Sequence, residues 1–310
     1  MEIKEYKSKK EWDDFLLENG GTFLQSSSWG DFKSFYQEIV RIEARENGKI
    51  TGVCQLFNEK SYFGDYFYIP HGPFSNEEKV REELFLEVSD MGRKENKIFV
   101  SSEPLHALNI GKKSFFRIQP KKTLVSNIED SFEETKKSFS KSTRYNIGYA
   151  ERKGVVTTKS DDVDSFFKLL EKTKTRQNFN SYPKEYFQRL LDIPNTELVL
   201  AVYNRKVIAG IIIIYFGETV SFLHSALDYS MRNLKAAALL RFDSIKLAKE
   251  KNCKFYDFWG IDEKKFPGVT EYKKSFGGDE VEYPEGRSIP INSLAYGGCK
   301  ILSSIKEKIK

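Results

Sequence analysis

Cysteine is scarce in this chain, and the three that occur form no recognisable pair. Cys54, Cys253 and Cys299 lie far apart, in or near apolar stretches, without a C-x-x-C spacing. Residues of this kind are typical of reduced packing positions, and they argue against a disulfide framework. The usage favours the reducing environment of the cytoplasm.

Long hydrophobic runs are also missing. The longest extends from Val207 to Phe216, too short to span a bilayer, and the N-terminal residues M-E-I-K-E-Y-K-S-K-K lack the apolar core of a signal peptide. We therefore expect a soluble, cytoplasmic protein, an expectation that still allows peripheral contact with the inner face of the plasma membrane.

Histidine is equally rare. His71, His106 and His224 have no metal-ligand spacing, and neither a Ser-His-Asp arrangement nor a cysteine nucleophile is evident. The sequence thus predicts no metal and no cofactor. A reaction catalysed by this chain would proceed without a covalent enzyme intermediate.

The charges are nearly balanced, because 50 Lys and Arg face 45 Asp and Glu, for a formal charge of +5. This mild excess permits an anionic partner without requiring one. At 310 residues with 39% apolar and 14% aromatic residues, the chain is long enough for two domains, each with a proper core.

A faint internal repeat suggests that the two halves share one architecture. The strand-turn-strand pattern that begins at Ala44 recurs at Ala201, 157 residues later. At the same offset the strand 97–100 falls on 254–257, and helical patterns at 77–93 and 235–251 precede these strands. The pattern predicts a duplicated α+β unit with mixed sheets flanked by helices.

Between the two repeats, several further elements are expected. The periodicity predicts helices over 131–138, 141–153 and 163–175, and strands over 124–128 and 155–158. Residues 300–310 form a short basic amphipathic pattern, more typical of a packing helix than of a membrane anchor.

The stretch Tyr256–Gly278 (Y-D-F-W-G-I-D-E-K-K-F-P-G-V-T-E-Y-K-K-S-F-G-G) carries the strongest signal of a site. A strand over 253–259 ends near Gly260, an exposed loop follows, and Lys273 and Lys274 then stand between aromatic residues and a glycine pair. One lysine half-buried over a reaction centre is the functional interpretation. The alternative is a pair of solvated surface lysines beside a turn.

The helix over 141–153 carries four cations, Lys141, Arg144, Arg152 and Lys153, around apolar Ile147 and Ala150. Such a helix can present charges to phosphates. An ordinary amphipathic helix with solvated lysines is the alternative.

Five segments taken together resemble the Fem-type (FemABX) aminoacyltransferases, which build peptidoglycan cross-bridges from aminoacyl-tRNA. The resemblance spans nearly the whole chain and rests on motifs in the family's order: Q-S-S-S-W-G-D-F-K at 25–33, Y-I-P-H-G-P at 68–73, K-S-T-R-Y-N-I at 141–147, Y-D-F-W-G at 256–260 and Y-K-K-S-F-G at 272–277.

The resemblance implies two tandem GNAT-like (acyl-CoA N-acyltransferase fold) domains. Because nothing here has the length or heptad pattern of the helical arm that many members insert, the chain looks like the compact, armless form. We expect residues 1–124 plus 285–310 to form a first, precursor-binding domain, and residues 125–284 to form a second domain for acyl transfer.

Functional positions carry over residue by residue. Lys33 matches the family lysine that meets the phosphates of the precursor, and Tyr36 falls where an aromatic lies close by. Lys273 matches the lysine that stabilises the oxyanion, with Tyr272 in the aromatic place beside it. The resemblance thereby marks Lys273 and Tyr272 as catalytic.

Four further positions concern substrate binding. Tyr186 matches a substrate-binding tyrosine, but Tyr182 stands where many members have an arginine, and His224 stands where a tyrosine is expected. Glu103 aligns with an acidic residue near the acceptor amine, and a strand-end carboxylate is its alternative role.

The implied reaction moves an amino acid from aminoacyl-tRNA to a side-chain amine of the stem peptide, with lipid II or UDP-MurNAc-pentapeptide as acceptor and a monomeric enzyme. The basic helix over 141–153 would then face tRNA. Two alternatives remain: an acetyl-coenzyme A-dependent N-acetyltransferase, although the segment 231–238 has no glycine for the pyrophosphate, and a non-catalytic RNA- or glycan-binding relative.

Overall fold

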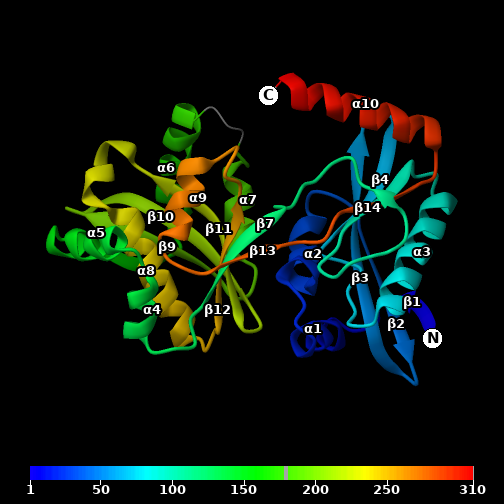
Figure 1. Ribbon diagram of the computed structural model, residues 1–310, viewed down its shortest axis with the longest axis horizontal. Coiled ribbons are helices and arrows are strands. Elements are labelled where there is room, and N and C mark those ends of the chain that lie inside the picture. Colours follow the sequence, from blue (N-terminus) through cyan, green and yellow to red (C-terminus); the bar gives the residue numbers. More distant parts are fainter. Residues whose placement is uncertain (178–180, 310) are drawn as a thin grey trace. The chain divides into compact units, whose positions relative to one another are not determined.

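The computed structural model describes residues 1–177 and 181–309 and divides into two compact units (Figure 1). Unit 1 comprises Met1–Lys121 and Glu282–Lys310, and unit 2 comprises Lys122–Val281. Each division falls three residues before the predicted one. The first does so because strand β7 (Lys122–Asn127) already belongs to the sheet of unit 2, where Thr123 is opposite Gly260.

Unit 1 is built on a seven-stranded sheet in the order β1-β2-β3-β4-β5-β14-β6. The strands are β1 Glu2–Glu5, β2 Ile39–Glu46, β3 Lys49–Ser61, β4 Gly64–Pro70, β5 Phe99–Glu103, β6 Lys112–Lys113 and β14 Arg287–Pro290. The accompanying helices are α1 Lys9–Glu18, η1 Phe23–Gln25, α2 Ser27–Ser34, α3 Glu78–Lys94 and α10 Ser293–Ile309.

Unit 2 has a second seven-stranded sheet in the order β13-β7-β12-β11-β10-β9-β8. Besides β7, its strands are β8 Val156–Ser160, β9 Thr196–Tyr203, β10 Lys206–Phe216, β11 Thr219–Leu227, β12 Phe255–Ile261 and β13 Asp279–Glu282. Its helices are α4 Phe132–Ser138, α5 Lys141–Arg152, α6 Val163–Gln177, α7 Lys184–Leu191, η2 Tyr229–Leu234, α8 Ala236–Glu250 and α9 Pro267–Lys274.

The predicted duplication is confirmed by the topology. β2 and β3 begin at Ile39 and Lys49, and β9 and β10 begin 157 residues later, at Thr196 and Lys206. In both units a meander of three antiparallel strands is followed by a helix, α3 or α8, that leads to a parallel neighbour, β5 or β12. A helical crossover is what a parallel pair requires.

The two units differ in how far that parallel pair stays together. β4 and β5 are paired from Phe67 opposite Val100 through Pro70 opposite Glu103, the ends of both strands. β11 and β12 are paired only through Ser221 opposite Asp257, although the strands continue to Leu227 and Ile261. The ladder between β11 and β12 therefore stops partway along both strands.

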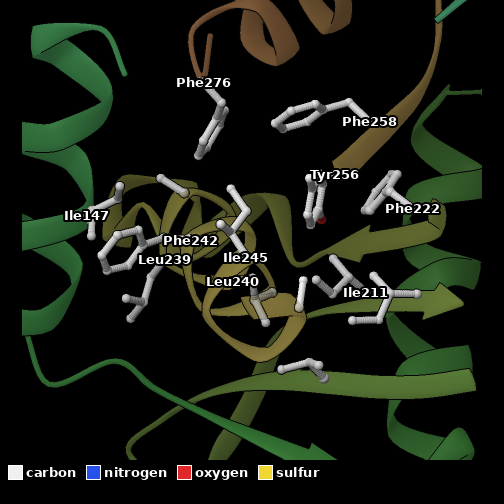
Figure 2. Packing of buried hydrophobic residues seen from close by; sticks show 14 of the residues in the cluster. Ile147, Ile211, Phe222, Leu239, Leu240, Phe242, Ile245, Tyr256, Phe258 and Phe276 are labelled. Atoms are coloured by element: carbon white, nitrogen blue, oxygen red, sulfur yellow. The ribbon is translucent and has the colours of Figure 1, made fainter. Parts of the chain in front are cut away.

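The core of unit 2 lies between its sheet and helices α5 and α8 (Figure 2). Phe242 and Ile245 on α8 project toward the sheet, and Ile147 faces them from α5. Phe258 and Phe276 close the cluster near α9, with ring centroids 5.8 Å apart. This packing fixes the backbone on which the site is built.

Most predicted elements appear, with ends shifted by a few residues. The helix predicted over 77–93 is α3 at Glu78–Lys94, and the one over 163–175 is α6 at Val163–Gln177. The predicted loop is present at 262–266, but the prediction was wrong for 267–271, where α9 begins at Pro267, a favoured residue for the first turn of a helix. The C-terminal helix is also longer than expected, since α10 starts at Ser293.

No helical arm interrupts unit 2. Within residues 122–177 and 181–281, helices reach at most the 15 residues of α6 and α8. In the part of the chain that the structure describes, no helix combines the length and the hydropathy needed to cross a membrane.

Substitution of Gly210, in β10, tests the packing of unit 2. A Cβ at Gly210 would lie 2.8 Å from both Leu200 and the ring of Phe166, so Gly210→Ala should lower the free energy of unfolding by about 1–3 kcal/mol. Urea unfolding measures the loss. Gly268→Ala on exposed α9, where a Cβ would meet nothing within 4 Å, should be neutral or stabilising. Equal effects of the two changes would refute this account of the packing.

Candidate active site

Lys273 lies on the last turn of α9 with its side chain turned inward. The residue is only 8% exposed, and its ammonium donates to the carbonyl oxygens of Gly260 at 2.6 Å and Trp259 at 3.2 Å. The functional interpretation of the lysine pair thus applies to Lys273. Lys274, its neighbour, points out to solvent and pairs with Glu263 and Glu280.

The two carbonyls that hold Lys273 belong to an irregularity in β12. The register against β7 shifts between Asp257 and Gly260, which marks a β-bulge. Within it Trp259 has φ = 62°, a left-handed conformation that is uncommon for a bulky residue. Bulges re-aim the groups on a strand, and this one carries the acceptors for Lys273. The strand itself continues through Gly260 to Ile261, one residue beyond its predicted exit.

The Asp257 carboxylate stabilises the bulge through hydrogen bonds. It accepts hydrogen bonds from the Trp259 N–H at 2.7 Å and from the Thr123 hydroxyl. Burial raises the pKa of Asp257 to about 6, while these donors and the nearby Lys273 ammonium oppose the rise. The carboxylate therefore fixes the backbone whose carbonyls face Lys273.

Arg241, on α8, supplies a second buried cation. It is 4% exposed, and its guanidinium carbon stacks 3.6 Å from the ring centroid of Phe222. It donates a long hydrogen bond to the Tyr256 hydroxyl at 3.4 Å. Among the described side chains, residues 1–175 and 181–305, no carboxylate forms an ion pair with Arg241, and its guanidinium instead lies against the faces of Phe222 and Phe258.

The electrostatics of the site act on Lys273. Burial, and to a smaller extent the Arg241 cation, lower the pKa of Lys273 to about 8, and the Asp257 carboxylate opposes both effects. At neutral pH the ammonium form still predominates. The arrangement is a preorganised cation with little water around it, the kind of group that stabilises a developing oxyanion.

Tyr272 lies beside these cations but belongs to the core. Its ring packs edge-on against Phe276 at 5.4 Å, and its hydroxyl lies close to Arg241. Burial raises the pKa of Tyr272 to about 12, which keeps the phenol protonated. The structure thus places the predicted catalytic pair on adjacent residues of one helix.

The predicted substrate-binding residues of unit 2 form one aromatic cluster. Tyr182, which is 51% exposed, stacks on Tyr186 with centroids 3.9 Å apart. His224 contacts both rings edge-on from β11. Burial lowers the pKa of His224 to about 4, so this imidazole is neutral. The cluster presents a flat, uncharged aromatic face.

Lys33 and Tyr36 lie in unit 1, near the end of α2. Burial lowers the pKa of Lys33, and the carboxylate of Glu59 opposes this effect. Tyr36 is 43% exposed and packs edge-on against Phe32. A partly desolvated ammonium next to an exposed ring suits an anionic ligand.

Glu103 is placed differently from an exposed strand-end carboxylate. It is 1% exposed at the end of β5 and accepts hydrogen bonds from the backbone N–H groups of Ile118 at 2.5 Å and Gln119 at 2.7 Å. Burial raises its pKa, against these donors. In this arrangement Glu103 anchors the segment around residue 118.

The basic helix is α5, and its four cations are not equivalent. Arg144 donates to the carbonyl oxygens of Lys137 and Phe139 and so ties α5 to the end of α4. Arg152 and Lys153 lie over the rings of Tyr145 and Tyr149, at 6.0 and 5.5 Å from the centroids. Lys141, at the first turn, is exposed. Cations interleaved with exposed tyrosines are typical of single-stranded nucleic-acid surfaces.

Two residues of the site escaped the sequence analysis. Arg241 falls on the same helical face as Ile245 and Ala248, a position that predicts burial, but the sequence does not say what surrounds it. Asp257 stands inside an otherwise aromatic strand motif. A carboxylate at a position where the strand pattern predicts burial was the signal that could have identified it. Arg241 and Asp257 both act on the site together with partners that are distant in sequence, such as Phe222 and Thr123.

The opposing influences on Lys273 give a test. Arg241→Met should raise the pKa of Lys273 because it removes a neighbouring cation, whereas Asp257→Asn should lower it because it removes an anion. Carbon-13 NMR of lysine Cε, with the Lys273 signal assigned through Lys273→Met, measures both. Shifts of the same sign in the two variants would contradict the assigned electrostatics.

Comparison with known proteins places the chain in a family. The FemAB family matches residues 8–130, 111–206 and 195–304. The chain is 23% identical over 325 residues to a protein named lipid II:glycine glycyltransferase from Staphylococcus aureus (strain MRSA252), an alignment that covers 96% of this chain and 74% of that protein.

Solved structures share the fold. The crystal structure of FemX superposes with a TM-score of 0.85 at 17% identity, covering 97% of this chain and 100% of that one. A tandem GNAT protein from the clavulanic acid biosynthesis pathway, at 9% identity, has a TM-score of 0.58 over 93% of this chain and 98% of its own. The predicted fold class of two tandem GNAT-like domains is thereby confirmed, and the chain belongs to the FemAB family.

Proposed function

We propose that this protein is an aminoacyltransferase that moves an amino acid from aminoacyl-tRNA to an amine of a peptidoglycan precursor. The observation that carries the proposal is the buried Lys273 ammonium, held on the bulge of β12 in a member of the FemAB family. A relative that aligns over 96% of the chain is named for glycine transfer to lipid II.

The proposed reaction forms one negative charge, on the carbonyl oxygen of the ester, that the enzyme must stabilise. An amine nitrogen attacks the ester carbonyl, the carbonyl oxygen becomes an oxyanion, and collapse of the tetrahedral intermediate releases the ribose oxygen, which takes the proton lost by the amine. An ammonium has three N–H groups, and Lys273 uses two on the carbonyls of Trp259 and Gly260. The third is available to the oxyanion.

The expected contribution of this donor can be bounded. Removal of one oxyanion donor from a preorganised site typically costs about 3–4 kcal/mol, whereas positioning of the two reactants supplies about 7–11 kcal/mol in favourable cases. Lys273 would therefore provide a substantial but minor share of the rate enhancement. The rest falls to the surfaces that bind the two substrates.

Each surface has candidate residues. For the acceptor, Lys33 and Tyr36 would meet precursor phosphates, and Tyr182, Tyr186 and His224 would contact the precursor through their flat faces. Glu103 would act on the acceptor indirectly, through the segment that it anchors. For the donor, the exposed cations and tyrosines of α5 would contact tRNA.

An acetyl-coenzyme A donor is the competing proposal. Enzymes of this fold bind pyrophosphate at bare amides where a glycine-rich turn opens the helix before the parallel strand. In this chain η2 and Lys235, the latter with φ = 59°, occupy the entry to α8, and residues 229–241 contain no glycine. The entry to α8 thus lacks the glycines that let bare amides approach a pyrophosphate closely, which favours the aminoacyl-tRNA donor.

The deciding experiment offers both acceptors at once. Purified protein is incubated with a mixed pool of radiolabelled aminoacyl-tRNAs and either UDP-MurNAc-pentapeptide or lipid II. Ribonuclease-sensitive transfer of label to an acceptor supports the proposal and identifies the acceptor. Transfer from acetyl-coenzyme A alone, or no transfer by folded protein, would overturn it.

Lys273 and Lys274 form a matched pair for mutation. Lys273→Met should lower turnover by about 10²–10³-fold, because it removes the oxyanion donor but keeps the volume of the side chain. Lys274→Met should leave turnover nearly unchanged, since that ammonium faces Glu263 and Glu280 at the surface. Circular dichroism checks that both variants fold. Full activity in Lys273→Met would remove this residue from the mechanism.

The α5 surface makes a separate prediction. The pair of changes Arg152→Glu and Lys153→Glu should weaken tRNA binding and make it less dependent on salt, because fewer counterions are released when fewer cations meet phosphates. Arg144→Ala should instead lower stability, since its guanidinium holds carbonyls of α4. Filter binding at several salt concentrations tests the first effect. An unchanged salt slope would exclude α5 from the tRNA surface.

A further inference from the structure

One face of unit 1 exposes more apolar surface than any described function of the unit requires. Helix α10 packs on the sheet through Ala295, Tyr296 and Cys299. A second apolar stripe, separate from this packing face, consists of Leu294, Ile301 and Ile305. These side chains are 90%, 63% and 47% exposed, although helices that pack on a sheet normally turn such residues inward.

The turn between β3 and β4 extends this stripe. Tyr62 is 89% exposed and Phe63 is 39% exposed, with their rings 5.3 Å apart. A Cβ on Gly298 would lie 2.7 Å from the Phe63 ring, so Phe63 rests on α10 at the helical position between Leu294 and Ile301. The turn and the helix therefore form one continuous face, termed the α10 face below.

A cavity opens beneath the α10 face. It has a volume of about 390 Å³. Tyr66 and Phe99 line it from the sheet, Phe63 and Leu302 line it from the turn and from α10, and Lys60, Ser61 and Ser303 add polar groups to the wall. A cavity of this size and lining suits an apolar chain more than a polar ligand.

The charges of the α10 face have one sign. In the segments 60–64 and 293–305 the charged residues are Lys60 and Lys300, and both are exposed. Amphipathic helices that lie on membranes combine exposed apolar residues with lysines that meet anionic headgroups. An exposed tyrosine such as Tyr62 is typical of the membrane–water interface.

A second copy of the chain is a poorer occupant. A two-fold interface brings the same patch of both subunits together, so Lys60 and Lys300 would face the same cations across it. Stable dimers also bury about 800 Å² on each partner, more than one helical stripe and a turn readily supply. An anionic bilayer, in contrast, complements both the apolar stripe and the lysines.

We propose that the α10 face docks on the surface of an anionic lipid bilayer, with Leu294, Ile301, Ile305 and Tyr62 entering the interface and Lys60 and Lys300 meeting the headgroups. The aromatic cavity beneath the face then accepts an apolar chain from the same bilayer. This inference stands without the transferase reaction. It adds to that reaction only a means of reaching a lipid-linked acceptor, a step that rests on the proposed function.

The docking face also has a connection to the predicted precursor site of unit 1. Tyr66, in the wall of the cavity, is opposite Glu59 in the β3–β4 ladder, and Glu59 is the carboxylate that acts on Lys33. A lipid-linked diphosphate whose chain entered the cavity would therefore approach the same side of the sheet as Lys33.

Vesicle flotation tests the proposal with the full chain. The probes are vesicles of phosphatidylcholine alone and of phosphatidylcholine with phosphatidylglycerol in equal parts. The wild type should float with the anionic vesicles. Leu294→Asp and Ile301→Asp together should reduce binding by at least about tenfold, because two apolar side chains no longer leave water. Lys300→Glu should reduce it about fivefold on anionic vesicles alone.

A matched control and a second readout keep the result interpretable. Leu86→Asp, on α3, changes a side chain that is 49% exposed outside the α10 face and should float like the wild type. Lys300→Glu changes an exposed residue and serves if the apolar variants fail to fold. No flotation of the wild type, or equal flotation of all variants, would overturn docking.

Size-exclusion chromatography with light scattering covers the remaining outcome. A wild-type dimer that Leu294→Asp and Ile301→Asp convert to a monomer, without any vesicle binding, would assign the face to a second copy and refute the bilayer. Transfer to the soluble UDP-MurNAc-pentapeptide, measured in parallel, reports on the proposed reaction separately, because that acceptor has no lipid chain.

Discussion

The candidate active site depends on the hydrogen bonds that the Lys273 ammonium donates to two carbonyls of the β12 bulge. A lysine in a nearly dry location is costly unless its N–H groups find acceptors. The carbonyls of Trp259 and Gly260 are such acceptors, and they face the lysine only because Trp259 adopts a left-handed conformation. Strain in the strand and burial of the cation therefore support each other, as strained backbone at a functional site often does.

The duplicated units differ in the parallel strand pair that lies next to this cation. Both sheets follow the same topology, but β4 and β5 stay paired to their ends while β11 and β12 part after Ser221 and Asp257. At the repeat offset of 157 residues, Asp257 corresponds to Val100 and Lys273 to Phe116. The first unit thus carries apolar residues at these sequence positions, and Phe116 lines its aromatic cavity.

Two buried cations in one core are an unusual combination, and aromatic rings make it tolerable. Arg241 lies against Phe222 and near Phe258, and Lys273 lies 6.0 Å from the same Phe222 ring. Ring faces attract cations without quenching their charge, unlike carboxylates. The pair therefore keeps a positive potential available for a substrate while Asp257 secures the backbone beneath it.

The local pattern of the sequence determined the α+β class, the duplicated unit, most helices and strands, and Lys273 as the residue of greatest interest, because periodicity and motif order act over short distances. The left-handed turn at Trp259, the partnership with Arg241 and the two roles of the α5 cations came only from the tertiary structure. Each depends on residues brought together from distant segments, such as Arg144 on the carbonyls of α4 or Thr123 on Asp257. The sequence specifies the type of each side chain, but the charge state and the hydrogen-bond partners of that side chain depend on the residues that the fold brings next to it.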